Sequence, residues 1–245
     1  MGSEVWDEST AASYDADVSD LSTPEAVGPA VDLLAHLADG RAALEFAIGT
    51  GRVAIPLHQR GIPVTGLELS QPMINVLHTK VTANEIPVIQ GDMATTVVPG
   101  EFSLVYLVFN TISNLRTQTE QVECFRNAAR HLSDAGRFVI ELWVPPLRSM
   151  PPGQNAVPFD VSDGHLGFDT YDVVTQECAS HHYTRQPDGT IRYSVGHFRY
   201  VWPSELDLMA HIAGLELEHR YADWDTSPFT ADSTKHISVY RKTAQ

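Results

Sequence analysis

The chain has 245 residues, 43% of them hydrophobic, which is enough to bury one large core or a core with an appendage. Its 16 basic and 31 acidic residues give a net charge of −15, which disfavours a nucleic-acid partner because phosphate binding relies on Lys and Arg. No apolar run reaches the roughly 18 residues of a membrane span, and we see no basic and apolar leader of a secretory signal. The two cysteines, Cys124 and Cys178, form neither a metal-ligand spacing nor a disulfide framework. We therefore expect a cytoplasmic protein.

Residues 1–40 are acidic and end in one predicted helix. Between Pro24 and Ala38 the apolar residues recur at helical spacing. Those on one face are Val27, Val31, Leu34 and Leu37. Ahead of this helix, residues 6–20 contain a Tyr-Asp pair, Tyr14 and Asp15. We expect a helical segment that precedes the main fold.

A strand predicted near 42–47 ends in a carboxylate and passes into a loop with two glycines. Glu45 lies at the end of the strand, and Gly49 and Gly51 can adopt positive φ and let another molecule approach the backbone. The helix predicted near 52–60 offers unpaired N–H groups at its start. The glycine spacing differs from that of dinucleotide-binding loops, and Glu45 would repel a phosphate but suit a ligand with cationic groups.

Two further predicted strands also end in acids. The strand near 63–69 ends at Glu68, and the strand near 87–91 is followed by Asp92, with a helix predicted over 71–84 between them. Glu68 follows the glycine loop at about the distance expected for an acid that holds a ribose. Ligands of open α/β sheets bind at the carboxyl edge of the strands. Three acids at that edge favour adenosine with a cationic tail over a nicotinamide dinucleotide.

Two more strands, near 103–108 and 136–143, continue the alternation with a helix near 118–133. Alternating strands and helices over residues 41–144 predict a parallel sheet with right-handed crossovers. The loop after the fourth strand carries Phe109, Asn110 and Asn114. It carries no Asp, so the clustered ligands of a metal-dependent enzyme are missing and we predict no metal.

The pattern changes over residues 145–200. Two long β-like runs, Thr170–Arg185 and Thr190–Val201, are separated by Gln186-Pro187-Asp188-Gly189, which is a hairpin signal. We expect a long antiparallel hairpin that covers the ligand edge of the sheet or builds a homo-oligomer interface. Its polar face would carry several side chains able to meet a substrate. They include His181, His182 and Tyr183.

The last segment, residues 201–245, is expected to complete the core. Ser204 is predicted to cap a helix that runs through Ala213. The runs Leu215–Trp224 and His236–Arg241 can form two final strands as an antiparallel pair. With the five strands before them they would make a sheet of seven strands.

Residues from about 40 to 145 resemble the class I S-adenosylmethionine-dependent methyltransferases. The first motif of that family is usually written E/D-x-G-x-G-x-G, and this chain has Ala47 in place of the first glycine. The segment from Phe109 to Glu141 is similar to small-molecule methyltransferases of actinobacterial natural-product pathways, several of which methylate the amine of an aminosugar. It lacks the Asn/Asp-Pro-Pro-Tyr/Phe motif of enzymes that methylate nucleic-acid bases or glutamine amides.

The resemblance implies an α/β fold with a Rossmann-like, seven-stranded class I methyltransferase sheet and an inserted antiparallel β hairpin as a cap. The expected organisation is an N-terminal helical lid (1–40), a cofactor-binding core (41–144), the inserted cap (145–200) and a C-terminal completion of the sheet (201–245). Tyr14 belongs to the lid, where a Tyr-Asp pair recurs in many methyltransferases and can touch the methionine tail or the substrate.

The resemblance also implies S-adenosyl-L-methionine as cofactor and S-adenosyl-L-homocysteine as its product. Glu68 would hold the ribose hydroxyls, Asp92 the exocyclic amine of adenine, and the Met93 backbone a ring nitrogen. Met73 would lie on the adenine face. The predicted cofactor-binding residues are Glu45, Ala47, Gly49, Gly51, Arg52, Glu68, Leu69, Met73, Asp92, Met93 and Phe109.

The candidates for catalysis are fewer, because methyl transfer from a sulfonium depends mainly on alignment. The predicted catalytic residues are Tyr14, Asn110, His181 and His182, with Asn114 and Tyr183 as further candidates for orienting the nucleophile. A histidine has a suitable pKa for accepting a proton near neutrality. Aromatic side chains that could line the pocket and stabilise a cation are Phe109, Trp143, Trp202 and Trp224.

We therefore predict a methyltransferase acting on a small molecule, with an amine nitrogen of a secondary metabolite or aminosugar as acceptor. The preference for nitrogen comes from the family resemblance alone. O-methylation of a hydroxylated metabolite in the same fold is an alternative. A catalytically silent cofactor-binding or assembly protein is another, because fold does not dictate function. A nicotinamide oxidoreductase is opposed by the glycine spacing and by Glu45.

Overall fold

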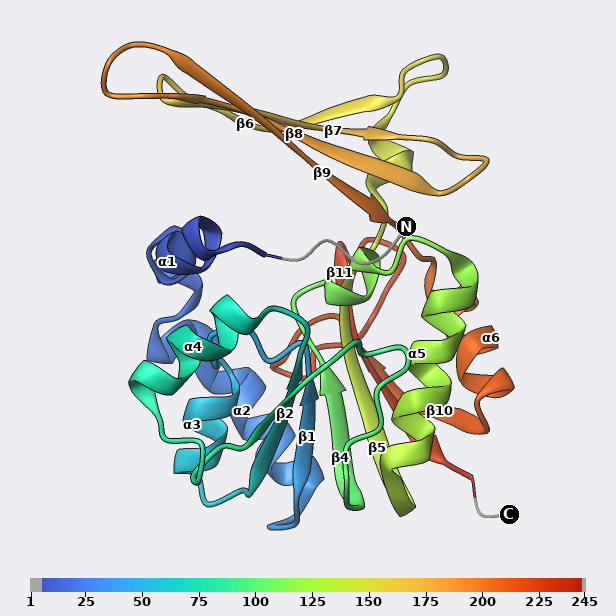
Figure 1. Ribbon diagram of the computed structural model, residues 1–245. Helices are drawn as coiled ribbons and strands as arrows, with labels where there is room; N and C mark the ends of the chain where they lie inside the picture. Colours follow the sequence, from blue (N-terminus) through green and yellow to red (C-terminus); the bar gives the residue numbers. More distant parts are fainter. Residues whose placement is uncertain (1–5, 244–245) are drawn as a thin grey trace.

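The computed structural model of this chain describes residues 6–243; residues 1–5 and 244–245, at the ends of the first and last expected segments, lie outside the described residues. A sheet of seven strands forms its centre, in the order β10-β11-β5-β4-β1-β2-β3 (Figure 1). The strands are β1 (Ala43–Phe46), β2 (Val64–Glu68), β3 (Val88–Gln90), β4 (Phe102–Leu107), β5 (Leu132–Trp143), β10 (Leu215–Tyr221) and β11 (Lys235–Lys242). Only β11 runs antiparallel to both of its neighbours, which confirms the predicted α/β sheet.

Helices cover both faces of this sheet (Figure 1). On one face lie α2 (Pro24–Ala38), α3 (Ala54–Gln59) and α4 (Gln71–Lys80), and on the other lie α5 (Gln118–His131) and α6 (Pro203–Ile212). Strand β4 is buried along its whole length: Leu104 and Tyr106 pack into the core beneath α2 and α3, whereas Val105 and Leu107 pack beneath α5 and α6. An unbroken apolar run is what a strand covered on both faces requires.

Most helix boundaries follow from their capping residues. Thr23, Ser70 and Thr117 each accept a hydrogen bond from the backbone at the start of α2, α4 and α5. The prediction that Ser204 caps α6 was wrong. That helix begins two residues earlier than predicted, at Pro203, whose fixed φ and missing N–H suit the first helical position, and Trp202 is its N-cap without a side-chain bond. No helix within residues 6–243 is both long and apolar enough to cross a membrane.

The insertion after β5 is a second sheet of four antiparallel strands, not a two-stranded hairpin. Its strands, which we call the cap, are β6 (Ala156–Val161), β7 (His165–Tyr171), β8 (Glu177–Arg185) and β9 (Ile191–Arg199). The predicted run Thr170–Arg185 is broken by a turn, because Asp172 Oδ1 accepts the backbone N–H groups of Val174 and Thr175 and Gln176 adopts a φ of 62°. The predicted hairpin turn at 186–189 is present between β8 and β9.

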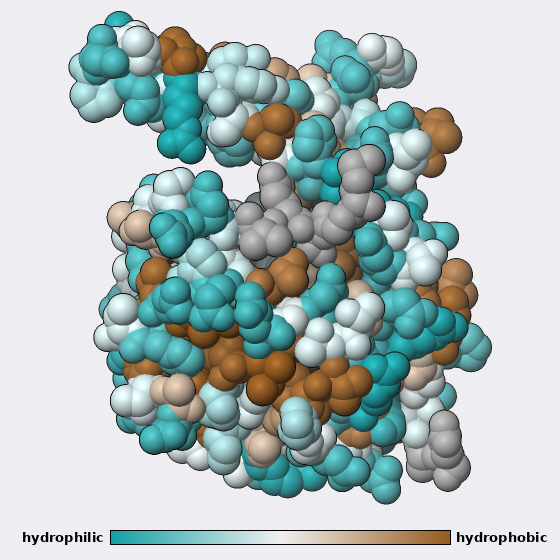
Figure 2. Space-filling model, viewed as in Figure 1, coloured by the Kyte–Doolittle hydropathy of each residue, from teal (hydrophilic) through white to brown (hydrophobic). Residues whose placement is uncertain are grey.

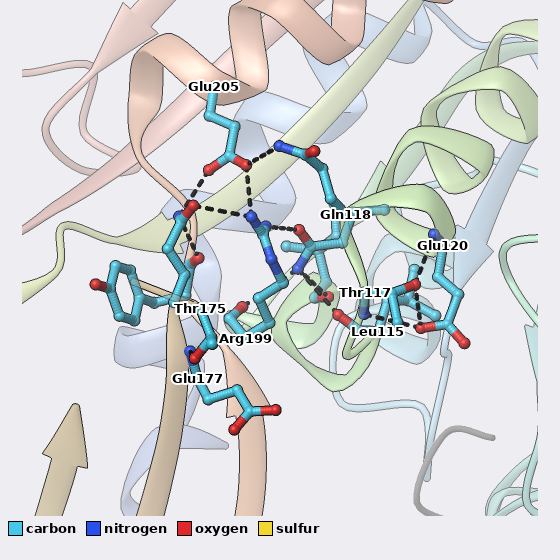
Figure 3. A network of polar contacts seen from close by, with 12 residues as sticks. Leu115, Thr117, Gln118, Glu120, Thr175, Glu177, Arg199 and Glu205 are labelled. Carbon is cyan, nitrogen blue, oxygen red and sulfur yellow. Dashed lines mark hydrogen bonds and ion pairs between the residues drawn. The ribbon is translucent and has the colours of Figure 1, made fainter. Parts of the chain in front are cut away.

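A buried polar network ties the base of the cap to α5 and α6 (Figure 3). Arg199, only 5% exposed at the end of β9, donates from Nη2 to Glu205 Oε1 at 2.7 Å and to Gln176 Oε1 at 2.9 Å, and from Nη1 to Gln121. Gln118 of α5 also donates to Glu205, at 2.9 Å. Each charge is paired and hydrogen-bonded, as burial requires. The network therefore fixes where the cap leaves the core.

A further helix, α1 (Glu8–Asp17), lies beside α4 and below the cap (Figure 1). Asp15 accepts hydrogen bonds from Thr50 Oγ1 and from Lys80 Nζ, each at 2.6 Å. Ser70 Oγ donates to the backbone oxygen of Trp6 at 2.6 Å. These bonds hold α1 across the loop that follows β1. The short 3₁₀ turns of the described part of the chain are η1 (Ser19–Leu21), η2 (Thr111–Asn114) and η3 (Pro146–Ser149).

Candidate active site

A cavity of about 960 Å³ lies between the carboxyl ends of the central strands, α1 and one face of the cap. In the space-filling view the cap overhangs the body of the molecule, with a hollow between them (Figure 2). Four parts of the chain that are distant in sequence line it: the N-terminal segment, the loops after β1 to β5, strands β6 to β9, and residues 233–235, where β11 begins. This is the edge at which open α/β sheets bind ligands.

The loop after β1 has positive φ at its two glycines, as predicted, and also at Ala47, where the sequence did not predict it. Ala47, Gly49 and Gly51 have φ of 52°, 57° and 87°. Ala47 and Gly49 line the cavity, but Gly51 does not. A Cβ on Gly51 would lie 3.0 Å from Ile55, so this glycine serves the close packing of α3 under the loop.

Glu45, at the end of β1, lies beneath the loop rather than on the cavity wall. It is 3% exposed, accepts a hydrogen bond from the Tyr106 hydroxyl at 2.9 Å, and is not among the lining residues. Burial raises its pKa to about 8, which the Tyr106 bond and nearby Arg52 only partly oppose. Its carboxyl group is therefore largely protonated at neutral pH in the ligand-free protein.

Glu68, at the end of β2, lines the cavity and is already held in place by backbone donors. Its Oε2 accepts from Gly49 N at 2.9 Å and its Oε1 accepts from Ser70 N at 2.8 Å. Burial raises its pKa, and these backbone bonds oppose the rise. Each carboxylate oxygen can accept two hydrogen bonds, so each keeps one free position for a ligand hydroxyl. The residue is thus fixed and still able to accept.

The loop after β3 contributes Asp92 and Met93, which line the cavity together with Leu69 and Met73 from the start of α4. Asp92 Oδ1 accepts the backbone N–H of Ala94 at 2.7 Å, which orients the carboxylate. Met73 is 3% exposed and Met93 is 8% exposed, so both thioethers also belong to the apolar interior. The four side chains give this end of the cavity an apolar wall and one acid.

The loop after β4 has two consecutive residues in the left-handed conformation. Phe109 and Asn110 have φ of 60° and 59°, and both line the cavity. Glu141 stabilises this loop: its Oε2 accepts from Phe109 N at 2.8 Å, and its Oε1 accepts from Trp224 Nε1 at 3.0 Å. Arg52 lies 4.8 Å from the centre of the Phe109 ring and does not line the cavity. Left-handed backbone at non-glycine residues costs about 1–3 kcal/mol and is found where a structure holds it for a purpose.

The N-terminal segment brings aromatic rings to the cavity. Tyr14 and Trp6 line it and meet edge to face with ring centres 5.5 Å apart. The pKa of Tyr14 is raised chiefly by burial, opposed by Arg52, so its hydroxyl stays protonated and available as a donor. The Tyr-Asp pair thus has two roles, because Asp15 attaches the helix while Tyr14 faces the cavity.

The two predicted histidines of the cap lie on opposite faces of β8. His182 lines the cavity, whereas His181 packs on the other face, stacked on Phe168 with ring centres 4.8 Å apart and bonded to Tyr193 Oη at 2.8 Å. Tyr183 lies on that outer face as well. Successive side chains of a strand alternate between faces, so His181 and His182 cannot both meet one ligand. Apolar side chains exposed on the outer face include Val161, Leu166, Ile191 and Tyr193, and an oligomer interface there stays a prediction.

Of the other residues predicted to line the pocket or orient the acceptor, some lie on the cavity wall and others do not. Asn114 and Trp143 line the cavity, whereas Trp202 and Trp224 do not. Trp224 is 8% exposed and buttresses Glu141 instead. Within residues 6–243 no group of three or more His, Cys, Asp and Glu side chains is placed to hold a metal ion.

Several residues of the cavity wall were missed from the sequence. Asp169 and Tyr171 of β7 and Ser180 of β8 line the cavity, and His165 of β7 contacts His182 at 3.0 Å. The alternation of β8 would have grouped Ser180 with His182, which are two residues apart. Nothing in the sequence pairs β7 with β8 in this register.

Comparisons with known proteins agree with this geometry. The chain matches the methyltransferase-domain family over residues 43–136. The structure of the CcbJ methyltransferase from Streptomyces caelestis is 34% identical and superposes with a TM-score of 0.83 over 98% of this chain and 100% of its own. The cypemycin N-terminal methyltransferase of Streptomyces sp is 26% identical over 97% of this chain and 98% of its own length. An N,N-dimethyltransferase of dTDP-4-amino-2,3,4,6-tetradeoxy-D-glucose from Saccharopolyspora spinosa is 31% identical over 44% of this chain and 43% of its own.

The fold, the strand-end acids and these similarities define a methyltransferase. The chain belongs to the S-adenosylmethionine-dependent methyltransferase family, and S-adenosylmethionine is its cofactor. The donor set fits this cofactor, since Glu68 is a fixed, buried carboxylate with one free acceptor position on each oxygen.

Proposed function

We propose that this enzyme transfers the methyl group to an amine nitrogen of a small secondary metabolite, such as an aminosugar. The observation that carries the proposal is the state of Asp169 on the cap wall of the cavity. Its Oδ2 accepts a hydrogen bond from the Tyr171 hydroxyl at 3.2 Å, whereas its Oδ1 is buried and accepts none from the described residues. A buried acceptor without a donor is costly. A protonated amine would supply both the missing donor and the opposite charge.

The names of the relatives support the same class of acceptor. One is an N-terminal methyltransferase of cypemycin, and another is an N,N-dimethyltransferase of an aminosugar nucleotide. The net charge of −15 would also favour the approach of a cationic acceptor.

The cofactor half of the site is proposed to follow the strand-end acids. Glu68 would accept the two ribose hydroxyls, Asp92 the exocyclic amine of adenine, and the Met93 backbone would meet a ring nitrogen. The remaining contacts are proposed for Ala47, Gly49, Leu69, Met73 and Phe109, which line the same cavity. Glu45, Gly51 and Arg52 would act from behind the loop, Glu45 through its hydrogen bond with Tyr106 and the other two by supporting the loop and Phe109.

The bound cofactor supplies an electrophilic methyl group on a positively charged sulfur. The task of the protein is to hold the acceptor nitrogen in line with that group, and positioning alone can contribute an effective molarity of roughly 10⁵–10⁸ M. Asn110, held at the edge of the cavity by its bond to Trp143 N, and Tyr14 would orient the acceptor. On the cap, Asp169 would meet the amine, and His182 would act on it through the neighbouring Ser180.

The proposal is tested by turnover with isotopically labelled S-adenosylmethionine against amines and the alcohols of matching shape, including aminosugar nucleotides. We expect the label on nitrogen, and we expect mass spectrometry to detect products that carry one or two added methyl groups. Label on oxygen alone, or tight S-adenosylhomocysteine binding with no turnover of any acceptor, would refute it.

A substitution at Asp169 tests whether this carboxylate binds the acceptor amine. Asp169→Asn keeps the shape but removes the charge, so we expect KM for the amine to rise by about 10–100-fold, since hydrogen bonds to charged groups contribute about 1.5–3 kcal/mol. Asp163→Asn, in the exposed turn between β6 and β7, is the matched control. Equal KM values for the two variants would remove Asp169 from the acceptor site.

A further inference from the structure

The cap contains a chain of hydrogen bonds that begins at the cavity and ends at solvent. Ser180 Oγ and His182 Nε2 are 3.2 Å apart, His182 Nδ1 and His165 Nε2 are 3.0 Å apart, and His165 Nδ1 and Asp160 Oδ2 are 2.6 Å apart. Ser180 and His182 line the cavity, whereas 43% of the Asp160 side chain is exposed. Four side chains from three neighbouring strands thus connect the site to water.

We propose that this chain of hydrogen bonds is a proton relay that removes the proton from the acceptor amine. The inference rests on the proposed function, since only an acceptor that carries a proton at neutral pH needs such a relay. An alkylamine has a pKa of about 10, so nearly all of it enters the site as the ammonium ion, which has no lone pair for the methyl group.

The donors and acceptors can all point in one direction. Asp160 accepts from His165 Nδ1–H, which leaves His165 Nε2 to accept from His182 Nδ1–H. His182 Nε2 then accepts from the Ser180 hydroxyl, whose lone pairs are left for the ammonium proton. When the ammonium proton moves to Ser180 Oγ, each hydrogen-bonded proton shifts one place, and the Asp160 carboxylate becomes a carboxylic acid. The amine gains its lone pair, no electron is transferred, and Asp160 releases the proton to water.

The packing around the two imidazoles is specific. Gly167 pairs with His182 across β7 and β8, and a Cβ at Gly167 would come within 2.2 Å of Phe159 and 2.9 Å of His165. With glycine there, the Phe159 ring packs 6.2 Å from the His165 ring and 5.3 Å from the His182 ring, centre to centre. The two imidazoles are themselves stacked, 5.2 Å apart. A larger residue at 167 would separate the rings, so the geometry depends on this glycine.

The surroundings of His182 keep it in the form that the relay needs. Burial lowers its pKa, neighbouring His165 lowers it further, and Asp169 opposes with a smaller effect in the other direction; His181 on the same strand also lowers it. The other charged or titratable residues that line the same cavity are Tyr14, Asp17, Glu68, Asp92, Arg148, Tyr171, Cys178, Tyr200 and Lys235. His182 is therefore neutral and able to accept at neutral pH.

Two measurements test the relay, and the first does not depend on activity. In the full chain with S-adenosylhomocysteine, ¹⁵N NMR of the histidines at neutral pH should find both His182 and His165 protonated at Nδ1 and bare at Nε2. A proton on His182 Nε2 would mean that this imidazole donates to Ser180 and cannot receive a proton from the cavity, which overturns the proposal.

The second measurement is the pH profile of kcat/KM for the best amine, in His182→Gln and His165→Gln. Glutamine keeps a hydrogen-bonding side chain but cannot carry a proton. We expect a loss of about 100-fold at neutral pH, the lower limit for general acid–base catalysis, that shrinks as the pH approaches the pKa of the ammonium. His181→Gln is the matched control, because it is adjacent, makes two hydrogen bonds and lies on the opposite face.

A purely structural role would lower the rate equally at every pH. Profiles of the two variants that are parallel to that of His181→Gln therefore overturn the relay. If no amine is methylated, the proposed function fails, and the NMR result still decides in which direction the hydrogen bonds from Ser180 to Asp160 are donated.

Discussion

The substitution Glu45→Gln tests whether the acid of the first motif is ionised in the folded protein. Glu45 is 3% exposed, its one side-chain partner is the Tyr106 hydroxyl, and burial raises its pKa from 4.5 to about 8. At neutral pH the native residue is then largely a neutral carboxylic acid. Glutamine has nearly the same shape and no charge, so it mimics that form and can still accept from Tyr106.

The expected magnitude follows from the two pKa values. A group whose folded pKa lies above its unfolded value contributes stability that is present in full below the unfolded pKa and is lost as the pH rises through the folded one. For Glu45 this window runs from 4.5 to about 8. At 1.36 kcal/mol per pH unit, the loss is on the order of 5 kcal/mol across the window, of which roughly 3 kcal/mol falls below neutral pH. The variant lacks this loss.

Urea unfolding followed by circular dichroism, from pH 5 to pH 8.5 without cofactor, measures the difference. The free energy of unfolding of Glu45→Gln minus that of the native protein should grow with pH, because titrating groups that do not interact with Glu45 cancel in the comparison. Glu101→Gln, an exposed acid before β4, should show no such trend. A difference that stays flat with pH for Glu45→Gln would mean that the carboxylate is ionised in the fold, and the reasoning would be wrong.

Three further substitutions probe the cofactor site, the cap and the N-terminal helix. Glu68→Gln should weaken S-adenosylhomocysteine binding by roughly 10–100-fold in calorimetry, because an amide has one acceptor oxygen where both native oxygens already accept backbone bonds. Arg199→Ala should lower the free energy of unfolding by about 3 kcal/mol in a urea titration, since it leaves Glu205, whose side chain is 13% exposed, without its cation. Asp15→Asn should speed hydrogen exchange in α1, because it weakens the bonds to Thr50 and Lys80.

Each of these has an outcome that contradicts it. Unchanged affinity in Glu68→Gln would exclude the ribose assignment. Arg199→Ala would have to be compared with Arg192→Ala, an exposed arginine of β9, and equal stabilities would mean that the network at the base of the cap contributes nothing. For Asp15→Asn, exchange in α1 as slow as in Asp20→Asn, at an exposed site beyond the helix, would show that other contacts hold the helix.

The centre of the sheet could be predicted because β1, β2 and β4 are short, largely apolar runs separated by glycine, proline and charged residues. The cap was predicted only in part, and the turn at 172–176 explains why. Val173 and Val174 are 66% and 88% exposed in that turn, where two adjacent valines read as a continuing strand. The Asx bonds of Asp172 and the left-handed Gln176 override that preference, and Gln176 is held by its bonds to Tyr200 O and Glu205. Such long-range partners are invisible to local pattern reading.

The candidate site shows the same division. The strand-end acids were predictable, because every parallel strand delivers its end to the same edge of the sheet. The depth at which each acid lies could not be predicted. Glu45 lies beneath the loop and Glu68 lies on the cavity wall, although both come at the end of an apolar run. For the cap, alternation separates His181 from His182, but which face meets the cavity depends on how the cap is attached to the core.

That attachment makes the two halves of the site separable. The acids proposed for the cofactor come from the central sheet, whereas Asp169, Ser180 and the histidines come from a second sheet whose strands pair only with one another. The cap meets the core at the buried Arg199 network, on the side of α5 and α6 and away from the loop after β1. Substitutions on the inner face of the cap can therefore change which acceptor is bound without altering the backbone bonds that fix Glu68. A site built in this way can keep one cofactor while its acceptor changes, and this is why the sequence identified the methyl donor more readily than the molecule that receives the methyl group.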